Sequence, residues 1–314
     1  MVNIIVVIIP IFLIIIMGNI LKRTKWLDDA FLAQCNKLIF NIFLPVLIFD
    51  KISQSNFSEV FSIRHIGIMI ASLVLLFVIS FPLAKLLRLP QKMVGTFASS
   101  NYRPNLGYLG LPICYFTLGD EGLVAASVLL AFGIPVNNVL GVLAFTSGKS
   151  SRFSFVAFLR DSLYNPLVIS CMAGILFAAL KWHLPGIIVN ALSIIGGVPL
   201  ALALISIGAT TNFNCLKGNV QVISVSVIMK LLVQPLTAYL MLLGFGLTSF
   251  SLLLDKVLIL MLAAPCAQVN YIFASAMDGD TDLASGSIVA TTLFSIITFS
   301  LWLHLLGTGN SAGF

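Results

Sequence analysis

The sequence predicts an all-α polytopic membrane protein, with ten transmembrane helices arranged as two inverted five-helix repeats. Three observations predict this fold class: an apolar composition, long stretches without ionisable residues, and matching proline-containing interruptions in the two halves. Of the 314 residues, 59% are hydrophobic and 9% are charged, whereas soluble domains carry about a quarter charged residues. An ordinary soluble protein is therefore excluded. The net charge of +6 does not indicate nucleic-acid binding, because Lys and Arg lie mostly in short loops.

Stretches without Asp, Glu, Lys, Arg or His define most of the expected spans. Each reaches the roughly 18–20 apolar residues that a helix needs to cross a bilayer core. They cover residues 2–21, 66–84, 122–148, 162–180, 184–216, 231–254, 257–277 and 283–303. Lys230 interrupts the region 218–254, which still predicts one helix near 219–242. Two further spans, 31–48 and 93–116, contain polar residues and prolines, which brings the total to ten.

The Lys and Arg residues are unevenly divided between the two sides of the expected membrane. One set of alternate loops holds ten of them: Lys22, Arg23, Lys25, Lys85, Arg88, Lys92, Lys149, Arg152, Arg160 and Lys217. The other set holds four: Lys51, Arg64, Lys181 and Lys256. Loops rich in Lys and Arg stay in the cytoplasm. We therefore expect a multi-pass protein of the cell (inner) membrane with both termini periplasmic.

An odd number of helices in each half means that a second copy of the repeat enters the membrane upside down. Pro45 and Pro199 lie at corresponding places of spans two and seven, and Pro104 and Pro265 interrupt spans four and nine. The prolines are separated by 59 residues in the first half (45 to 104) and by 66 in the second (199 to 265). The expected division is a first repeat over 1–147, a linker over 148–154 and a second repeat over 155–314.

The interruptions of spans four and nine indicate a transport site. Residues 101–112 combine two Asn, an Arg, two Pro and two Gly where apolar residues are expected, and 263–271 contains Pro265, Gln268 and Asn270. Broken helices at corresponding positions of two halves mark substrate sites near the bilayer midplane, where half-helix ends interact with ions. The alternative is two independent proline kinks that neighbouring helices pack against.

The motifs Phe-Asn-Ile-Phe-Leu-Pro-Val-Leu-Ile-Phe (40–49) and Arg-Pro-Asn-Leu-Gly-Tyr-Leu-Gly-Leu-Pro (103–112) resemble the auxin efflux carrier family. This family includes plant PIN carriers and bacterial malate and malonate permeases, and the resemblance extends over essentially the whole chain. It implies that broken helices 4 and 9 cross at their breaks. It also implies a scaffold of spans one, two, six and seven, and a moving domain of the remaining spans. The long cytoplasmic loop of many plant members is absent, so auxin is not implied as substrate.

Arg103 and Lys230 are the two cationic residues expected deep in the membrane. A mid-membrane Arg faces a cavity or a partner, and its planar guanidinium suits a carboxylate. The alternative for Arg103 is a structural role on carbonyls freed by Pro104, and the alternative for Lys230 is a contact with a helix end. The expected substrate-binding residues are Asn101, Arg103, Pro104, Asn105, Gly107, Asn138, Lys230, Pro265, Gln268 and Asn270. For the amides, the alternative is a role in holding helices together.

The acidic residues all lie at span ends or in loops, which favours an anionic substrate. The expected function is a secondary carrier for a small organic anion, a mono- or dicarboxylate such as malate. A sodium- or proton-coupled cation antiporter is the alternative, although it needs a mid-span carboxylate. An enzyme is disfavoured, since no HExxH motif or paired intramembrane Asp occurs. The expected partners are the anion, the bilayer, sodium or a proton as coupling ion, and a second copy in a homodimer. Cofactors, metal ligands, catalytic residues and nucleic acid are not expected.

The expected topology is testable with reporter fusions at Phe314. A periplasm-active reporter fused there should be active and a cytoplasm-active reporter inactive, because the excess of Lys and Arg holds the opposite loops in the cytoplasm. Fusions in the loop at Lys25 provide the control and should give the reverse pattern. A cytoplasmic C-terminus would mean nine or eleven spans and would contradict the repeat.

Overall fold

The computed structural model describes residues 3–55, 61–146, 164–211, 215–216, 219–244 and 253–307, and over these residues it contains helices and no strand. Six helical stretches in this part of the chain are long and apolar enough to cross a membrane: Asp29–Ser53, Ile63–Leu86, Leu106–Thr146, Gly186–Thr210, Val220–Gly244 and Thr281–Leu305. The expectation of an all-helical, polytopic membrane protein is therefore confirmed. The expected linker, 148–154, lies outside the described residues.

The first half begins with a separate helix, α1. The next three helical segments follow one another directly and form one long helix. Asp28 caps this long helix by accepting a hydrogen bond from the amide of Phe31 at 2.6 Å. A five-residue π-turn then precedes Pro45, whose ring removes one amide donor and displaces a carbonyl. The elements are α1 (Asn3–Arg23), α2 (Asp29–Leu38), the π-turn η1 (Ile39–Phe43), α3 (Leu44–Ser53) and α5 (Ile63–Leu86).

The remaining part of the first half contains an interrupted helix followed by a sharp reversal. The elements are α6 (Gln91–Tyr102), η2 (Leu106–Gly110) and α7 (Leu111–Thr146). Gly119 lies inside α7 with φ 70° and ψ −160°, a backbone conformation that only glycine adopts readily. The long α7 is therefore two helical arms that meet at Gly119.

The second half also contains helices with interruptions near prolines. Its elements are α9 (Pro166–Ala179), α10 (Gly186–Gly196), α11 (Pro199–Thr210), α12 (Val220–Ile228), η4 (Met229–Val233), α13 (Gln234–Gly244), α14 (Leu253–Ala263), α15 (Val269–Ala276) and α16 (Thr281–Leu305). A break at Pro199 separates α10 from α11, and α14 and α15 are separated by 264–268. Prolines thus accompany the irregular backbone in both halves.

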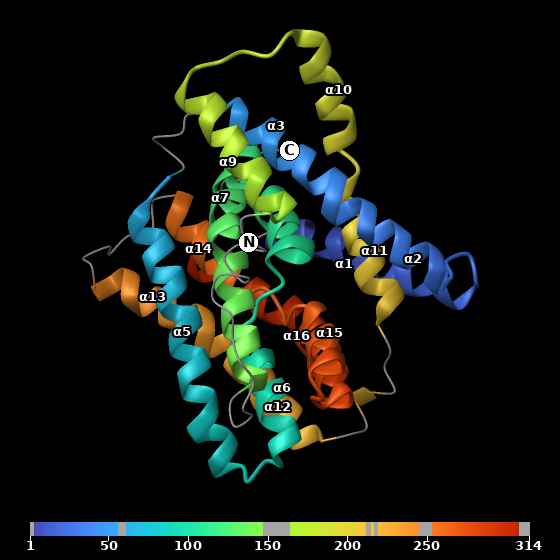
Figure 1. Cartoon of the computed structure of the whole chain (residues 1–314), viewed down its shortest axis with the longest axis vertical. Helices are drawn as coiled ribbons and strands as arrows, with labels where there is room; N and C mark the ends of the chain where they lie inside the picture. Colours follow the sequence, from blue (N-terminus) through green and yellow to red (C-terminus); the bar gives the residue numbers. More distant parts are fainter. Residues whose placement is uncertain are drawn as a thin grey trace.

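The helices pack in two groups. In one group α1 packs along α11, α3 packs against α9, and α10 contacts α3. In the other group α5, α6 and α7 pack together, α12 lies against α16, and α14 contacts α7, α13 and α16. Figure 1 shows α2, α3, α9, α10 and α11 toward the top and right, and α5, α6, α12 and α13 toward the bottom and left.

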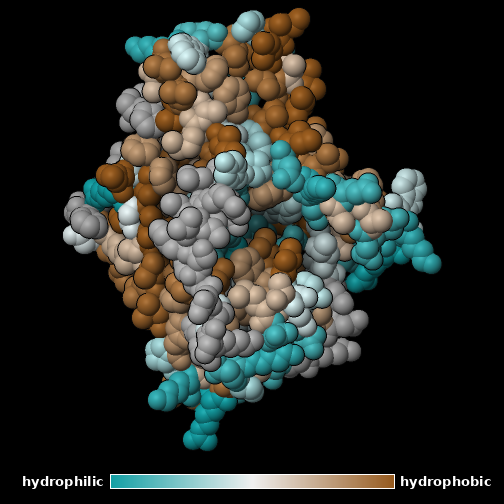
Figure 2. All heavy atoms as spheres, viewed as in Figure 1, coloured by the Kyte–Doolittle hydropathy of each residue, from teal (hydrophilic) through white to brown (hydrophobic). Residues whose placement is uncertain are grey.

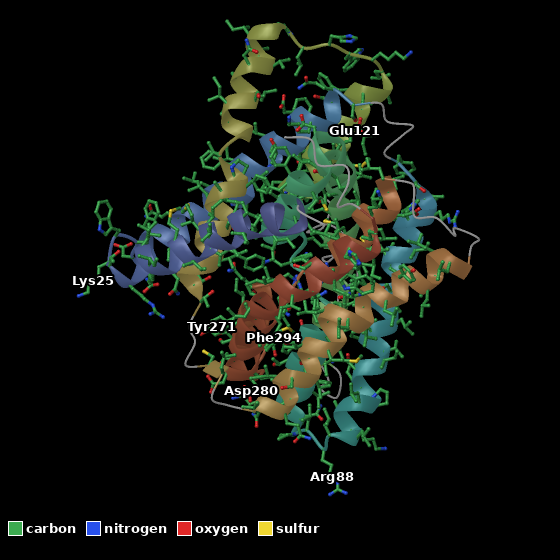
Figure 3. All side chains as sticks on the ribbon, turned by 180° about the vertical axis from the view of Figure 1, so that it is seen from behind. Lys25, Arg88, Glu121, Tyr271, Asp280 and Phe294 are labelled. Carbon is green, nitrogen blue, oxygen red and sulfur yellow. The ribbon has the colours of Figure 1, made fainter. Side chains whose placement is uncertain are left out.

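The outer surface matches a bilayer environment over the helices. Large apolar side chains are exposed on several of them, including Leu13 (57%), Ile187 (81%) and Ile297 (66%). Figure 2 shows hydrophobic residues over the upper and left parts of one face, and hydrophilic residues at its lower end and right-hand projection. Figure 3 places Arg88 at the bottom of the molecule, Lys25 at its left-hand projection and Glu121 toward the upper right. These three charged residues thus lie well apart from one another.

The contact between α1 and α11 depends on two glycines. A Cβ atom added at Gly208 would lie 1.7 Å from the carbonyl oxygen of Ile15, and one added at Gly18 would lie 2.1 Å from that of Ile205. Small residues allow membrane helices to approach this closely, and the close approach supplies the van der Waals contact that holds them together.

Gly208→Ala should therefore lower the melting temperature of the purified protein. The added methyl group meets backbone atoms that cannot rotate away, and overpacking of this kind costs about 1–3 kcal/mol. Gly67→Ala in α5 is the matched control, because a Cβ there meets no atom within 4 Å and alanine is the better helix former by roughly 1 kcal/mol. Equal melting temperatures for the two variants would contradict this account of the contact.

Candidate functional site

The interruptions of α6–η2 and α14–α15 lie directly against each other. The amide of Asn105 donates to the carbonyl of Pro265 at 2.8 Å, and the amide of Ala267 donates to the carbonyl of Arg103 at 3.1 Å. These two bonds make a short antiparallel bridge centred on Pro104 and Cys266. The expected approach of the two breaks at Pro104 and Pro265 is therefore observed. We call this arrangement the crossing.

The crossing leaves two backbone carbonyls, those of Tyr102 and Leu262, without the amide donor that each would have in a continuous helix. Leu106 N, which would bond to Tyr102 in a continuous helix, donates to Pro104 O at 2.9 Å instead. Cys266 N, the corresponding partner of Leu262, donates to the Thr291 hydroxyl at 3.1 Å. Each freed carbonyl needs another donor, because nothing in hydrocarbon can supply one.

Lys230 and Gln234, both on the π-turn region of span eight, supply those donors. The Lys230 ammonium donates to Leu262 O at 3.0 Å and to the side-chain oxygen of Gln234. The Gln234 amide in turn donates to Tyr102 O at 2.6 Å. Both side chains are fully buried. Lys230 therefore contacts the end of α14, as the alternative interpretation of this residue expected. It is not among the residues that line the cavity described next.

A cavity of about 460 Å³ opens beside the crossing. Its walls come from both helix groups: α2, η1, α3 and α9 on one side, and η2, α7 and α15 on the other. Most of the lining is apolar. The polar lining residues are Asn36, Arg103, Asn105, Tyr108, Asn137, Asn138, Asn165 and Gln268. This volume falls within the range of roughly 300–1,000 Å³ that small-molecule sites occupy.

Arg103 is the charged residue of this lining. Its side chain is held on two sides: Nη2 donates to Asn138 Oδ1 at 2.7 Å, and the guanidinium carbon lies 4.5 Å from the centre of the Phe273 ring. Arg103 is 5% exposed, and its Nη1 has no hydrogen-bond partner among the described residues. The Oδ1 atom of Asn137, also in the lining, is likewise unpartnered there. The lining therefore contains one fixed cation, with a buried donor nitrogen that has no partner among the described residues.

Six of the ten expected binding residues line the cavity: Arg103, Pro104, Asn105, Gly107, Asn138 and Gln268. Asn105 also caps η2, since its side chain accepts from the amide of Tyr108 at 3.1 Å. Gln268 donates to the hydroxyl of Thr210 on α11 at 2.9 Å. The crossing thus places residues of the 103–112 motif and the side-chain amide of Gln268 in the lining of one cavity.

The other four expected residues lie outside the lining. Besides Lys230, Asn101 donates to Ser80 Oγ at 3.0 Å and so joins α6 to α5. Asn270 donates to Ser99 O at 3.1 Å and accepts from Ser99 Oγ at 2.7 Å, which joins α15 to α6. Pro265 contributes its carbonyl to the crossing. These residues build the frame of the site.

Asn36 and Tyr108 are lining residues that sequence reasoning missed. Asn36 Oδ1 accepts from Ser206 Oγ at 2.6 Å and from the Tyr108 hydroxyl at 3.2 Å, and so connects α2, α11 and η2. A signal was present, because Asn36, Phe40 and Leu44 recur every four residues on one face of span two. Asn165, also missed, caps α9 by accepting from Leu167 N at 2.9 Å.

The buried acids lie away from this cavity. Asp255, in the first turn of α14, lies 2.9 Å from the ring of His65 on α5, and Asp50 lies near the end of α3. Both positions are at span ends, as expected, although both side chains are buried.

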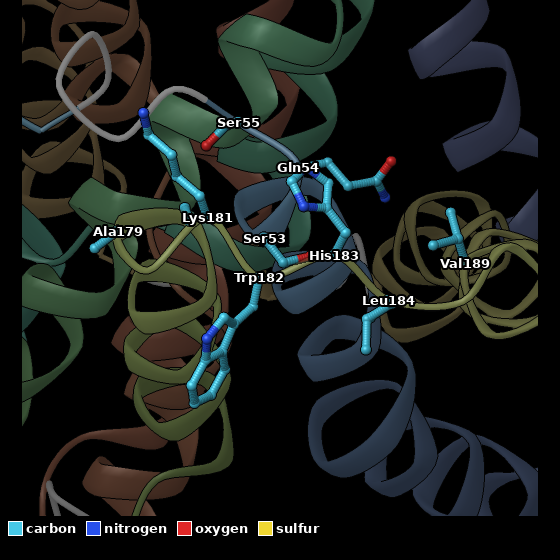
Figure 4. Close-up of a pocket in the computed structure, with 10 residues that line it drawn as sticks. Ser53, Gln54, Ser55, Ala179, Lys181, Trp182, His183, Leu184 and Val189 are labelled. Atoms are coloured by element: carbon cyan, nitrogen blue, oxygen red, sulfur yellow. The ribbon is translucent and has the colours of Figure 1, made fainter.

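A larger recess of about 630 Å³ lies at the outer ends of α3 and α9. Ser53, Gln54, Lys181, Trp182 and His183 line it, and Trp182 is 54% exposed. Figure 4 shows that Lys181 and Trp182 point in different directions and do not converge on one point. This recess therefore has polar lining residues whose longest side chains diverge.

Comparison with known proteins places these features in a family. A family model described as "Membrane transport protein" matches residues 3–303. The chain belongs to this family. It is the auxin efflux carrier or PIN-like family that the motifs indicated, so the resemblance is confirmed.

Relatives in this membrane transport protein family align with nearly the whole chain, and the alignments include nearly the full length of each relative. An "Uncharacterized transporter" of Methanothermobacter thermautotrophicus is 26% identical, with 94% of this chain and 96% of the relative covered. A "Putative malonate transporter" of Rhizobium meliloti is 22% identical, covering 96% and 95%. The "Uncharacterized transporter YfdV" of Escherichia coli K12 is 23% identical, covering 94% and 95%. The protein is thus a multi-pass membrane transporter and not an enzyme.

Lys230→Met should lower the melting temperature of the purified protein. Methionine keeps the length and apolar stem but removes the donor to Leu262 O, and an unsatisfied buried acceptor costs about 1–3 kcal/mol. Lys37→Met, at an exposed position of α2, is the matched control and should melt with the wild type. A Lys230→Met protein as stable as this control would show that the ammonium does not support the crossing.

Proposed function

We propose that the protein is a secondary carrier that moves a small organic anion, a mono- or dicarboxylate such as malonate or malate, by alternating access. One observation carries the proposal. Arg103 places a buried, oriented guanidinium in the lining of the cavity at the crossing, where the other lining residues that the structure describes are uncharged, and its Nη1 has no hydrogen-bond partner among the described residues.

A carboxylate is the ligand that this guanidinium suits. Arginine presents parallel N–H donors that match the two oxygens of a carboxylate, and such charge-assisted pairs are the strong ones. Asn138 and Phe273 restrict the rotation of the Arg103 side chain, so little rotational freedom is lost on binding. The η2 and α15 segments begin at Leu106 and Val269, both in the lining. Helix N-termini carry a partial positive charge and add to the attraction.

The position of the cavity between two helix groups fits alternating access. The proposal assigns the group of α1, α3, α9, α10 and α11 as scaffold, and the group that carries the crossing as the moving domain. In this arrangement ten spans form two inverted five-helix repeats, with both termini periplasmic in the cell membrane. Rocking of one group against the other then exposes a fixed site to each side in turn.

The cation antiporter is the weaker candidate. Such a carrier needs a carboxylate to hold its cation, and Arg103 is the charged residue among those that line the cavity. The printed name of one relative gives malonate, a dicarboxylate. Malonate and malate should raise the melting temperature of the purified protein if the proposal is right. An antiporter specific for cations predicts no effect of either anion.

Arg103→Lys tests the role of the guanidinium directly. The substitution keeps the charge but loses the paired hydrogen bonds, which costs about 1.5–3 kcal/mol, or roughly ten- to hundredfold in affinity. Malonate binding is measured by calorimetry, with the melting temperature of the unliganded protein recorded on the same preparations. Arg103→Ala should weaken binding further.

Arg88→Lys, at an exposed loop position, is the matched control and should bind as the wild type does. Suppose instead that Arg103→Lys loses stability while the folded fraction keeps wild-type affinity. Arg103 then supports the backbone at the crossing and does not bind substrate, and the proposal fails.

A further inference from the structure

The cavity at the crossing lies in one half of the membrane-spanning region. Its lining includes Asn36, about two turns into α2, which begins shortly after the loop at Lys25. It also includes Ile272, which follows the crossing in α15. Along span two, the lining that the structure describes ends at Leu44, the first residue of α3. The cavity therefore lies on the Lys25 side of the crossing, and Figure 3 shows Glu121 away from Lys25, toward the upper right.

On the Glu121 side, an ion pair joins the two helix groups. The ammonium of Lys51, in the last turn of α3, lies 2.8 Å from Asp120 Oδ1 of α7. Helix α3 belongs to the group assigned as scaffold, and α7 belongs to the group that carries the crossing. Asp120 directly follows the reversal at Gly119, so it lies at the end of its helical arm. The side chains of Lys51 and Asp120 are 27% and 61% exposed, so water reaches the pair.

The surroundings of this pair allow the two groups to separate. A cavity of about 210 Å³ lies beside it, between α3, α10 and α11 on one side and α7 on the other. Close packing is therefore interrupted there. The Lys51 ammonium also attracts the buried carboxylate of Asp50, the preceding residue, so it keeps a favourable neighbour when Asp120 moves away. Asp120 is exposed, and water then hydrates its carboxylate.

We propose that Lys51 and Asp120 form a gate, an ion pair that holds the Glu121 side closed while the substrate cavity is accessible from the Lys25 side. Alternating access requires that one side of a fixed site closes while the other opens. Rocking of the groups into the opposite state separates the pair. In the expected orientation this is the periplasmic gate, and its role rests on the proposed function. An exposed ion pair shifts an equilibrium by up to about fivefold, which leaves both states accessible.

The test measures how fast a cysteine on the closed side reacts with a maleimide in the purified full-length protein, without any carboxylate. Leu123→Cys supplies this cysteine, because Leu123 is fully buried and lines the small cavity beside the pair. The wild type gives the background from native cysteines. Adding Asp120→Asn removes the ion pair, so the labelling rate should rise by up to about fivefold. Asp120→Lys places two like charges together and should raise the rate further. Glu121→Gln, exposed on the same arm, is the matched control and should leave the rate unchanged.

A double-mutant cycle shows whether the effect of Asp120 depends on Lys51. In a Lys51→Met background, Asp120→Asn should leave the labelling rate unchanged, because the pair is already absent. If Leu123→Cys folds poorly, Leu200→Cys on α11, which lines the same cavity and is buried, replaces it. Equal labelling with and without Asp120→Asn overturns the proposal. A lower melting temperature without faster labelling also overturns it, since the pair would then be a static support.

Malonate binding, measured on the same preparations, separates this proposal from the proposed function, because the labelling needs no substrate. Protein that binds malonate while its labelling ignores Asp120→Asn refutes the gate alone. Protein whose labelling responds to Asp120→Asn through Lys51, but which binds neither malonate nor malate, refutes the carboxylate carrier alone.

Discussion

The structure depends on the mutual satisfaction of two broken backbones inside a hydrophobic environment. Irregular backbone at membrane depth is tolerated only where other protein groups complete its hydrogen bonds. At the crossing, Asn105 and Ala267 each donate across to the opposite chain segment. Each break needs the other as its partner in these hydrogen bonds, so α6–η2 and α14–α15 form one unit. The cavity, the orientation of Arg103 and the placement of Asn138 all follow from that unit.

Two buried cations serve this unit in different ways. Lys230 has its ammonium occupied by Gln234 and Leu262 O, so it compensates the end of α14. Arg103 has one nitrogen on Asn138 and another without a partner among the described residues. Burial alone does not distinguish these cases, because both side chains are buried. What differs is whether the side chain keeps an N–H donor that has no hydrogen-bond partner among the described residues.

The sequence predicted the breaks well and their surroundings less well. Proline at 104 and 265 makes an interruption necessary for local reasons, and the density of Asn and Gly around 103–107 indicates a cavity. Whether Asn270 faces a cavity or Ser99 depends on helix rotation, which the local sequence leaves open. Lys230 could not be assigned for the same reason. Its partner Leu262 O is a backbone atom 32 residues away, without any signature in residue type.

The crossing bonds join main-chain atoms, and that has a consequence for how such proteins diverge. Every residue other than proline offers the same amide and carbonyl, so Asn105 N→Pro265 O and Ala267 N→Arg103 O do not specify the side chains at the donating positions. Side chains that line the cavity can then change over evolution while the frame persists. Relatives at 22–26% identity that still align over nearly the full length fit this expectation. Substrate preference is thereby free to drift on a shared backbone, and overall likeness alone is a poor guide to what each member carries.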